Sequence, residues 1–230
     1  MCGHYLGEQG GAVCSHCVQT LPRTEQARYR HNSTEMELAG RHPDIVAALK
    51  TMHLVRAAAF LHYEKGHPVQ HLIHQLKYSD LPQIGYQLGR QAAMEMYDAD
   101  FFDEIEVIVP IPLHPKRFRE RGYNQSEYIA RGIGEYLGVP VDTSHVVRVL
   151  DTPHQARLTN GTSDGQNAAA LRKENVANAF AVIRPEQMYH KHILLVDDLI
   201  TTGETMRACL RAMRVIRGAT ISVFALCKAR

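Results

Sequence analysis

The pattern of hydrophobic and polar residues changes once along the chain, near residue 104. Before residue 104, apolar residues recur every three to four positions, which predicts helices at 68–78 and 82–97. A more continuous apolar stretch ahead of them predicts a strand within 53–66 that ends at Gly66. After residue 104, short apolar runs predict strands at 104–113, 141–150, 179–183, 192–198 and 220–229. Amphipathic helices are predicted between some of these runs, at 121–138 and 203–218.

The order of these elements determines the fold class. Strands that alternate with helices form a mostly parallel sheet whose two faces are covered. The sequence therefore predicts an α/β protein with a mostly parallel, Rossmann-like sheet. The stretch 158–170 is rich in Gly, Ser and Asn, so we expect a mobile loop there.

Composition narrows the class of protein only in part. With 230 residues, 45% of them hydrophobic, the chain can bury one good-sized core. The formal charge is +2, from 26 basic and 24 acidic residues, and such a balance neither favours nor excludes nucleic acid. No apolar run is long enough to span a membrane, so no membrane insertion is expected. The first residues have no basic segment followed by an apolar one, so we predict no secretion signal and a cytoplasmic location.

The segment 192–205 carries the clearest chemical pattern. An apolar strand is followed by Asp197 and Asp198, at the strand end where open α/β sheets bind ligands. A short loop then opens a helix, and its residues are Thr201, Thr202, Gly203, Glu204 and Thr205. The N–H groups of a helix start and the hydroxyls suit a phosphate, while the glycine lets backbone approach it. The carboxylates suit a ribose diol and would stabilise positive charge that develops on a ribose carbon.

The segment could also have a purely structural role without a ligand, because aspartates end strands and threonines cap helices in many α/β proteins. Each feature is weak alone, whereas the ordered set of apolar strand, Asp-Asp, two apolar residues and Thr-Thr-Gly-x-Thr is specific. The set resembles the phosphoribosyl pyrophosphate motif of type I phosphoribosyltransferases. The resemblance implies that Asp197 and Asp198 are catalytic and that residues 201–205 bind the ribose 5-phosphate.

A second candidate segment follows the strand predicted at 104–113. Prolines stiffen its start, and several cations come next, whose planar guanidinium groups suit phosphate oxygens. We expect a pyrophosphate-binding loop opposite the 5-phosphate site, formed by Pro112, Leu113, His114, Lys116, Arg117 and Arg121. The alternative is a solvated basic turn.

The motifs P-x-P-L-H-P-x-R, from Pro110, and R-G-Y-N-Q, from Arg121, resemble the competence protein F family of phosphoribosyltransferase-like proteins. The stretch HLIHQLKY (71–78) fits the same pattern, as do Gln155, Leu158, Arg172, Asn175, Ala179 and Phe180. The extra NGTSDGQ residues after Leu158 depart from it. The resemblance implies a cysteine knuckle at 1–22, a linking segment and partial hood at 23–75, and a phosphoribosyltransferase domain at 76–230.

Three cysteines lie close together near the N-terminus. Cys14 and Cys17 have the C-x₂-C spacing with which two thiolates bind one tetrahedral Zn²⁺, and Cys2 would supply a third ligand. The family pattern has two such pairs, and here the partner of Cys2 would fall before Met1. A start upstream of Met1, a fourth ligand from His4 or His16, and a site without metal all remain open. Any zinc would be structural.

Three functions fit these observations. The first is a Mg²⁺-dependent phosphoribosyltransferase, in which a nitrogen nucleophile of unknown identity displaces pyrophosphate from phosphoribosyl pyrophosphate. The second is a non-catalytic module that binds single-stranded DNA and works with DNA-uptake proteins, because phosphate-binding loops and arginines suit DNA equally well. The third is a sensor of phosphoribosyl pyrophosphate without turnover.

Overall fold

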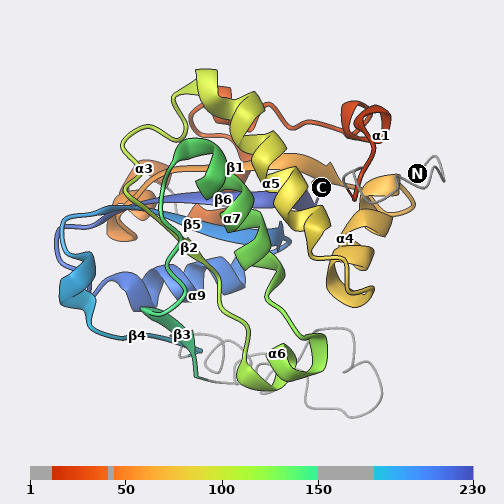
Figure 1. The fold of residues 1–230 in the computed structure, drawn as a ribbon. Helices are drawn as coiled ribbons and strands as arrows, with labels where there is room; N and C mark the ends of the chain where they lie inside the picture. The colour runs from red at the N-terminus through yellow and green to blue at the C-terminus, as the bar shows by residue number, and fades with distance from the viewer. Residues whose placement is uncertain (1–11, 41–43, 150–178, 230) are drawn as a thin grey trace, which may run out of the picture.

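A four-stranded parallel sheet forms the centre of the molecule (Figure 1). The computed structural model describes residues 12–40, 44–149 and 179–229. The strands lie in the order β1 (Leu54–Tyr63), β6 (Thr220–Ala229), β5 (His192–Ile200) and β2 (Val107–Pro110), and each neighbouring pair is parallel. The prediction of a mostly parallel α/β fold is therefore confirmed.

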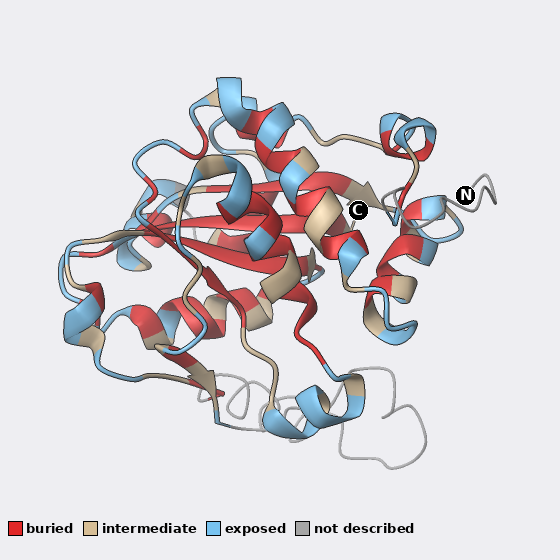
Figure 2. Ribbon diagram, viewed as in Figure 1, coloured by how far each residue is buried: buried red, intermediate tan, exposed pale blue. Residues whose placement is uncertain are grey.

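Helices cover both faces of this sheet (Figure 1). The face lined by Ala58, Leu194 and Phe224 packs against α4 (Pro68–Tyr78), α5 (Gln83–Met96) and α7 (Gln125–Leu137). The opposite face packs against α2 (Ser33–Ala39), α3 (Ile45–Thr51) and α9 (Glu204–Met213). Successive strand residues point to opposite faces, so an uninterrupted apolar run such as 193–196 is buried on both sides (Figure 2).

Two glycines let α5 and α7 approach each other closely. A Cβ atom on Gly132 would lie 2.0 Å from the Tyr86 carbonyl oxygen, and one on Gly89 would lie 2.2 Å from that of Ile129. Any side chain at either position would push the helices apart. Because α7 begins beside the C-terminal end of β5, this contact fixes the place of the residues that α7 contributes there.

The structure differs from the sequence predictions in two places. The strands predicted at 141–150 and 179–183 are shorter and lie outside the main sheet, where β3 (Val146–Arg148) and β4 (Phe180–Val182) form an antiparallel pair. The basic segment is not all loop, because α6 (Pro115–Arg121) lies within it. Pro115 favours a first helical turn, His114 caps it through Nδ1, and Gly122 ends it with a φ of +83°.

The outer edge of β1 is covered by the segment before it rather than by another strand. The Ala59 N–H donates to Gln26 Oε1 (3.0 Å), and the Ala57 N–H donates to Glu35 Oε1 (3.2 Å). The Asn32 side chain in turn donates to the Ala57 carbonyl (2.8 Å). We call Gln26, Asn32 and Glu35 the β1-edge cluster. It supplies hydrogen-bond partners to backbone groups at the edge of β1 and so blocks edge-to-edge pairing with another chain.

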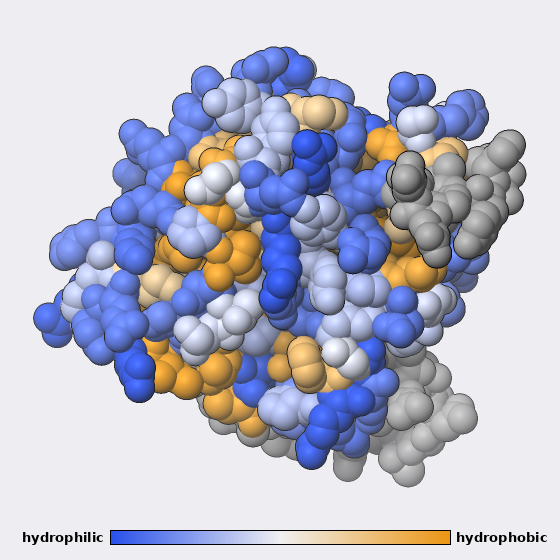
Figure 3. All heavy atoms as spheres, viewed as in Figure 1, coloured by the Kyte–Doolittle hydropathy of each residue, from blue (hydrophilic) through white to orange (hydrophobic). Residues whose placement is uncertain are grey.

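The remaining short elements connect these layers. They are α1 (Ser15–Gln19) and the 3₁₀ turns η1 (Gln26–Arg28), η2 (Tyr97–Ala99) and η4 (Pro185–Met188). Within the described ranges, no helix is long and apolar enough to cross a membrane. On the face in Figure 3, hydrophilic side chains dominate and apolar ones form scattered patches.

Several predicted features lie outside the described residues. They are Cys2, the loop predicted at 158–170, and the family-like positions Gln155, Leu158, Arg172 and Asn175. The division into segments 1–22, 23–75 and 76–230 stays a prediction.

Candidate functional site

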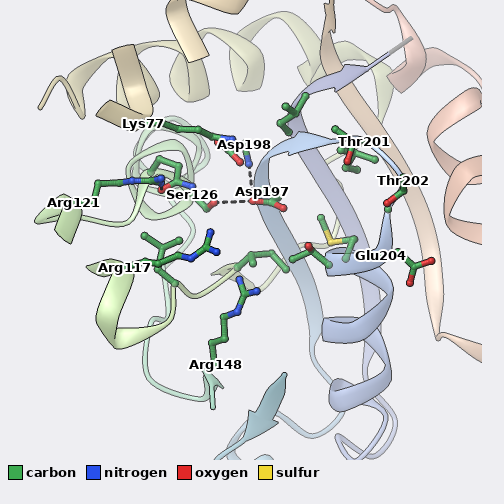
Figure 4. A pocket seen from close by; sticks show the side chains of 18 residues that line it. Lys77, Arg117, Arg121, Ser126, Arg148, Asp197, Asp198, Thr201, Thr202 and Glu204 are labelled. Atoms are coloured by element: carbon green, nitrogen blue, oxygen red, sulfur yellow. Dashed lines mark hydrogen bonds and ion pairs between the residues drawn. The ribbon is translucent and has the colours of Figure 1, made fainter. Parts of the chain in front are cut away.

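A cavity of about 290 Å³ opens at the C-terminal end of β5, where Asp197 and Asp198 stand (Figure 4). Its walls come from α4, α6, α7, β3 and the loop between β5 and α9. All seven residues assigned to the ribose and its 5-phosphate line it, together with Leu113, Arg117 and Arg121 of the predicted pyrophosphate segment. The structure therefore brings residues of both predicted segments to one cavity.

The two carboxylates at the floor of the cavity are buried, with Asp197 9% and Asp198 4% exposed. Asp197 Oδ1 accepts hydrogen bonds from Ser126 Oγ (3.0 Å) and from the Asp198 backbone N–H (2.9 Å). Burial, reinforced by the charge of Asp198, raises the pKa of the Asp197 carboxyl to about 7. Asp197 therefore changes its charge near neutral pH.

Asp198 makes a buried ion pair that the sequence reasoning did not predict. Lys77, in the last turn of α4, places its Nζ 2.7 Å from Asp198 Oδ2. Burial alone would lower the pKa of Lys77, but the charges and hydrogen bond of the neighbouring aspartates outweigh it and raise that pKa. Lys77 is therefore cationic at neutral pH.

The loop from Thr201 to Gly203 opens α9 and forms the opposite wall. Gly203 is its N-cap, with a φ of +69°, and no side chain caps the first turn. Arg207 braces this loop from behind by donating to the Thr202 carbonyl (2.5 Å) and to the Glu37 carbonyl of α2 (2.5 Å). Arg207 also pairs with the Glu204 carboxylate (2.7 Å). Arg207 thus balances the charge of Glu204 in the first turn of α9. The N–H groups at the start of α9 are therefore suited to an anion.

Three arginines line the side of the cavity away from α9 (Figure 4). Arg117 and Arg121 come from α6, and Arg148 comes from β3. Arg121 donates to the side-chain oxygen of Gln125, and its guanidinium lies 5.4 Å from the ring centroid of Tyr78. Arg148 lies 5.3 Å from the ring centroid of Phe180. Aromatic contacts of this kind hold a guanidinium in place without removing its charge.

The other three residues assigned to the pyrophosphate segment do not line the cavity. They are Pro112, His114 and Lys116. His114 has a structural contact, because its Nδ1 accepts the Lys116 backbone N–H (3.3 Å) at the start of α6. The roles assigned to all six residues stay predictions.

Sequence comparison with curated proteins shows the family of this chain. The DNA utilization protein YhgH of Salmonella typhimurium is 32% identical over 164 residues, which span 70% of this chain and 67% of that protein. Competence protein F of Haemophilus influenzae is 29% identical over 166 residues, which span 70% of this chain and 69% of that protein. The chain belongs to the competence protein F family. The resemblance drawn from the P-x-P-L-H-P-x-R and R-G-Y-N-Q motifs is therefore confirmed.

Other comparisons are more remote. Within the family, competence protein ComFC of Bacillus subtilis is 26% identical over 125 residues, or 54% of this chain and 45% of that protein. No model of a known protein family matches the chain. An allosteric regulatory enzyme of purine biosynthesis is 18% identical, with a TM-score of 0.42 over 66% of this chain and 30% of that one. A Staphylococcus aureus hypoxanthine phosphoribosyltransferase is 11% identical, with a TM-score of 0.35 over 72% of this chain and 82% of that one. Neither structural likeness bears on function.

The residues of the family-like R-G-Y-N-Q segment connect parts of the site. Tyr123 Oη donates to the Leu76 carbonyl at the end of α4 (2.6 Å). The Asn124 side chain caps α7 and donates to the Ile111 carbonyl after β2 (3.0 Å). Gln125 holds Arg121. The segment therefore fixes α4, β2 and α6 relative to Asp197.

The proposed zinc ligands are only partly within the described residues. Cys14 caps the short helix α1, and its Sγ accepts the Cys17 backbone N–H at 3.4 Å. In the part of the chain that the structure describes, no three His, Cys, Asp or Glu residues gather as a metal site. A zinc site that includes Cys2 stays a prediction. Cys209 and Cys227 are fully buried, as expected of small core residues.

Sequence reasoning missed five residues that build the site, namely Lys77, Gln125, Ser126, Arg148 and Arg207. A signal existed for Lys77, because Val69, Ile73 and Lys77 follow each other at helical spacing on the buried stripe of α4. Ser126 directly follows the R-G-Y-N-Q motif. Arg148 and Arg207 carry no such signal, since one lies on a short strand and the other on an ordinary amphipathic helix.

Proposed function

We propose that this protein binds phosphoribosyl pyrophosphate with Mg²⁺ and transfers its phosphoribosyl group to a nitrogen nucleophile. The observation that supports this most is the position of two buried carboxylates in one cavity, between the loop 201–205 and three arginines. We call these arginines, Arg117, Arg121 and Arg148, the arginine wall. A ribose that carries a phosphate at C5 and a pyrophosphate at C1 has the same order of charges: anion, diol, anion.

Each part of the ligand has a matching part of the cavity. The 5-phosphate lies on the N–H groups and hydroxyls of residues 201–205. The 2′- and 3′-hydroxyls donate to the aspartate carboxylates, and the pyrophosphate faces Arg117, Arg121 and Arg148. In the transfer, a bond forms from nitrogen to C1 as the C1–O bond to pyrophosphate breaks. Positive charge then develops next to the carboxylates, where fixed negative charge stabilises it.

The residues present fit a Mg²⁺ ion that arrives with the ligand. Asp198 is already paired with Lys77 and Glu204 with Arg207, so among the described residues no ready cage of carboxylates exists. Mg²⁺ would be held mainly by phosphate oxygens and water, and would neutralise charge on the leaving pyrophosphate. The arginine wall would orient the same group.

A role in handling DNA is the second candidate, favoured by the names of the relatives, which are DNA utilization and competence proteins. The arginines of the cavity suit a phosphodiester backbone. The carboxylates do not, because a strand inside the cavity would have its 3′-phosphodiester, and not a free diol, next to Asp197 and Asp198. Single-stranded DNA would therefore bind outside the cavity.

Calorimetric titration of the purified protein with phosphoribosyl pyrophosphate and Mg²⁺ tests this proposal. We expect binding by the wild type and none by the Asp197→Asn/Asp198→Asn variant, with both proteins folded by circular dichroism. A 5′-phosphorylated single-stranded oligonucleotide added in excess should leave that binding unchanged. No binding of phosphoribosyl pyrophosphate by a folded wild type would contradict the proposal, and competition by the oligonucleotide would contradict the placement of single-stranded DNA outside the cavity.

A further inference from the structure

Lys77 occupies an unusual position for a lysine. Its side chain is 14% exposed, and its Nζ lies 2.7 Å from an Asp198 oxygen at the floor of the cavity. Among the described residues, Asp198 Oδ2 has no hydrogen-bond partner apart from this ion-paired ammonium. Removal of the ammonium would leave a buried carboxylate oxygen without compensation, which is a costly state.

The surroundings of Lys77 hold its ammonium in place. Val69, Leu72, Ile73 and Leu76 bury the same side of α4 in the core. The Tyr123 hydroxyl anchors the preceding Leu76 carbonyl, so the last helical turn is fixed to the segment after α6. The C-terminal end of a helix also favours a positive charge. The ammonium is therefore preorganised against the carboxylate.

Other charged and titratable groups face this pair from the neighbouring elements. Asp197 of β5 adds negative charge, and Arg121 of α6 adds positive charge near Lys77. The thiol of Cys227 in β6 lies near Asp198, and that of Cys209 in α9 lies near Asp197, with Arg148 of β3 also acting on Cys209 through its charge. Burial raises the pKa of both thiols far above the usual range, so neither carries charge near neutral pH. Lys77 thus contacts Asp198 directly, and its charge also acts on Asp197.

We propose that Lys77 is a positioning residue of the ribose subsite, whose ammonium holds Asp198 in an ion pair and offsets the repulsion between the two aspartates, so that Asp197 acts as the second anionic acceptor. This inference rests on the proposed function for its ligand. Two adjacent buried carboxylates repel each other, and a fixed positive charge beside them reduces the repulsion. With Lys77 in place, both side chains present acceptor oxygens to a ribose diol once Asp197 has lost its proton, near pH 7.

The opposite role would be a plug, in which the ammonium occupies Asp198 and competes with the ribose hydroxyls. The two roles predict opposite effects of removing the charge. A supporting cation makes the wild type the tighter binder, whereas a plug makes the variant without it the tighter binder.

The experiment compares Lys77→Met with Lys77→Arg, which keeps the charge, and with Lys228→Met. Lys228 is the matched control, because it is also a buried, ion-paired lysine, 3.8 Å from Glu37, but does not line the cavity. Affinity for ribose 5-phosphate is measured from pH 6 to 9. Ratios to the wild type at each pH cancel the titration of the ligand's own phosphate.

We expect Lys77→Met to bind about tenfold more weakly at pH 7, and the midpoint of its pH profile to move up by about one unit. Lys77→Arg should recover most of the affinity, and Lys228→Met should keep the wild-type profile. A Lys77→Met variant with an unmoved midpoint would show a merely structural lysine. Tighter binding by that variant would show a plug. Either outcome overturns the proposal.

A second measurement needs no ligand and separates this inference from the proposed function. If the wild type binds neither ribose 5-phosphate nor phosphoribosyl pyrophosphate, the proposed function fails, and carboxyl ¹³C resonances of labelled aspartates then decide the role of Lys77. The Asp197 signal, assigned with Asp197→Asn, should titrate near pH 7 in the wild type and higher in Lys77→Met. An identical midpoint in both proteins would overturn the inference.

Discussion

Two buried polar groups of this molecule, the β1-edge cluster and the carboxylates of the cavity, are built in opposite ways. In the β1-edge cluster, Glu35 is 2% exposed and accepts one backbone N–H on each carboxylate oxygen, from Ala57 and His31. At the cavity, Asp197 and Asp198 are also buried, yet two acidic groups are adjacent and face a space that can hold a ligand.

The difference shows how a structural buried charge is distinguished from a candidate functional one. Burial alone does not separate them, because both groups are almost inaccessible. Partners do separate them: each Glu35 carboxylate oxygen accepts a hydrogen bond from a fixed backbone donor, whereas burial and the adjacent charge of Asp198 raise the pKa of Asp197 to about 7. A buried acid with a raised pKa beside a cavity is a candidate functional group.

The sharpest test of this contrast is Asp197→Asn, which should lower affinity for phosphoribosyl pyrophosphate about a hundredfold, because an anionic acceptor is lost. Stability should change in the opposite direction. An acid with a raised folded-state pKa loses stability as pH rises from near 4, its unfolded value, to about 7. Asp197→Asn should therefore melt at a higher temperature than the wild type at pH 8, with the difference absent at pH 4. A lower melting temperature at pH 8 would contradict this account.

The counterpart in the β1-edge cluster is Glu35→Leu. The Ala57 and His31 N–H groups would lose their acceptor, so unfolding should become easier by about 2 kcal/mol. Urea denaturation measures this loss, and calorimetry should show wild-type affinity for phosphoribosyl pyrophosphate at temperatures where the variant is folded. Weakened binding by a fully folded variant would mean that the two groups are not independent.

Titration of the wild type should also distinguish the two groups. If only ionised Asp197 accepts the ribose hydroxyls, affinity for ribose 5-phosphate should rise about tenfold from pH 6 to pH 8, as the carboxyl loses its proton near pH 7. Glu35→Leu should show the same rise. Asp197→Asn should show only the smaller change that comes from the phosphate of the ligand, and an equal rise in that variant would assign the effect elsewhere.

The smallest effect concerns the arginine wall. Arg121→Ala should weaken binding of phosphoribosyl pyrophosphate about fivefold, since one charged contact to a solvated phosphate is removed. Arg119 on the same helix is the matched control, because it is exposed and does not line the cavity. Equal losses from Arg119→Ala and Arg121→Ala would indicate a general charge effect rather than a contact within the cavity.

The part of the site that could be predicted from the sequence consists of consecutive residues. The segment 197–205 forms a strand end, a turn and a helix start, and local chemistry determines all three. Lys77, Ser126 and Arg207 reach the same place from three separate helices, and only the packed fold brings them there. The dependence on the packed fold also explains why β3 and β4 were assigned to the parallel sheet. Their apolar pattern is typical of such a sheet, but their antiparallel pairing depends on contacts between residues distant in sequence.

Arg207 gives the molecule a mechanical link between its first and last thirds. Its guanidinium joins the Thr202 carbonyl to the Glu37 carbonyl, so the loop that opens α9 is tethered to α2. A displacement of α2 would pull on the backbone at Thr202, and an anion bound to the loop that opens α9 would stiffen α2 in return. Amide exchange in residues 33–39 would then slow when a ligand occupies a site formed more than 160 residues further along the chain.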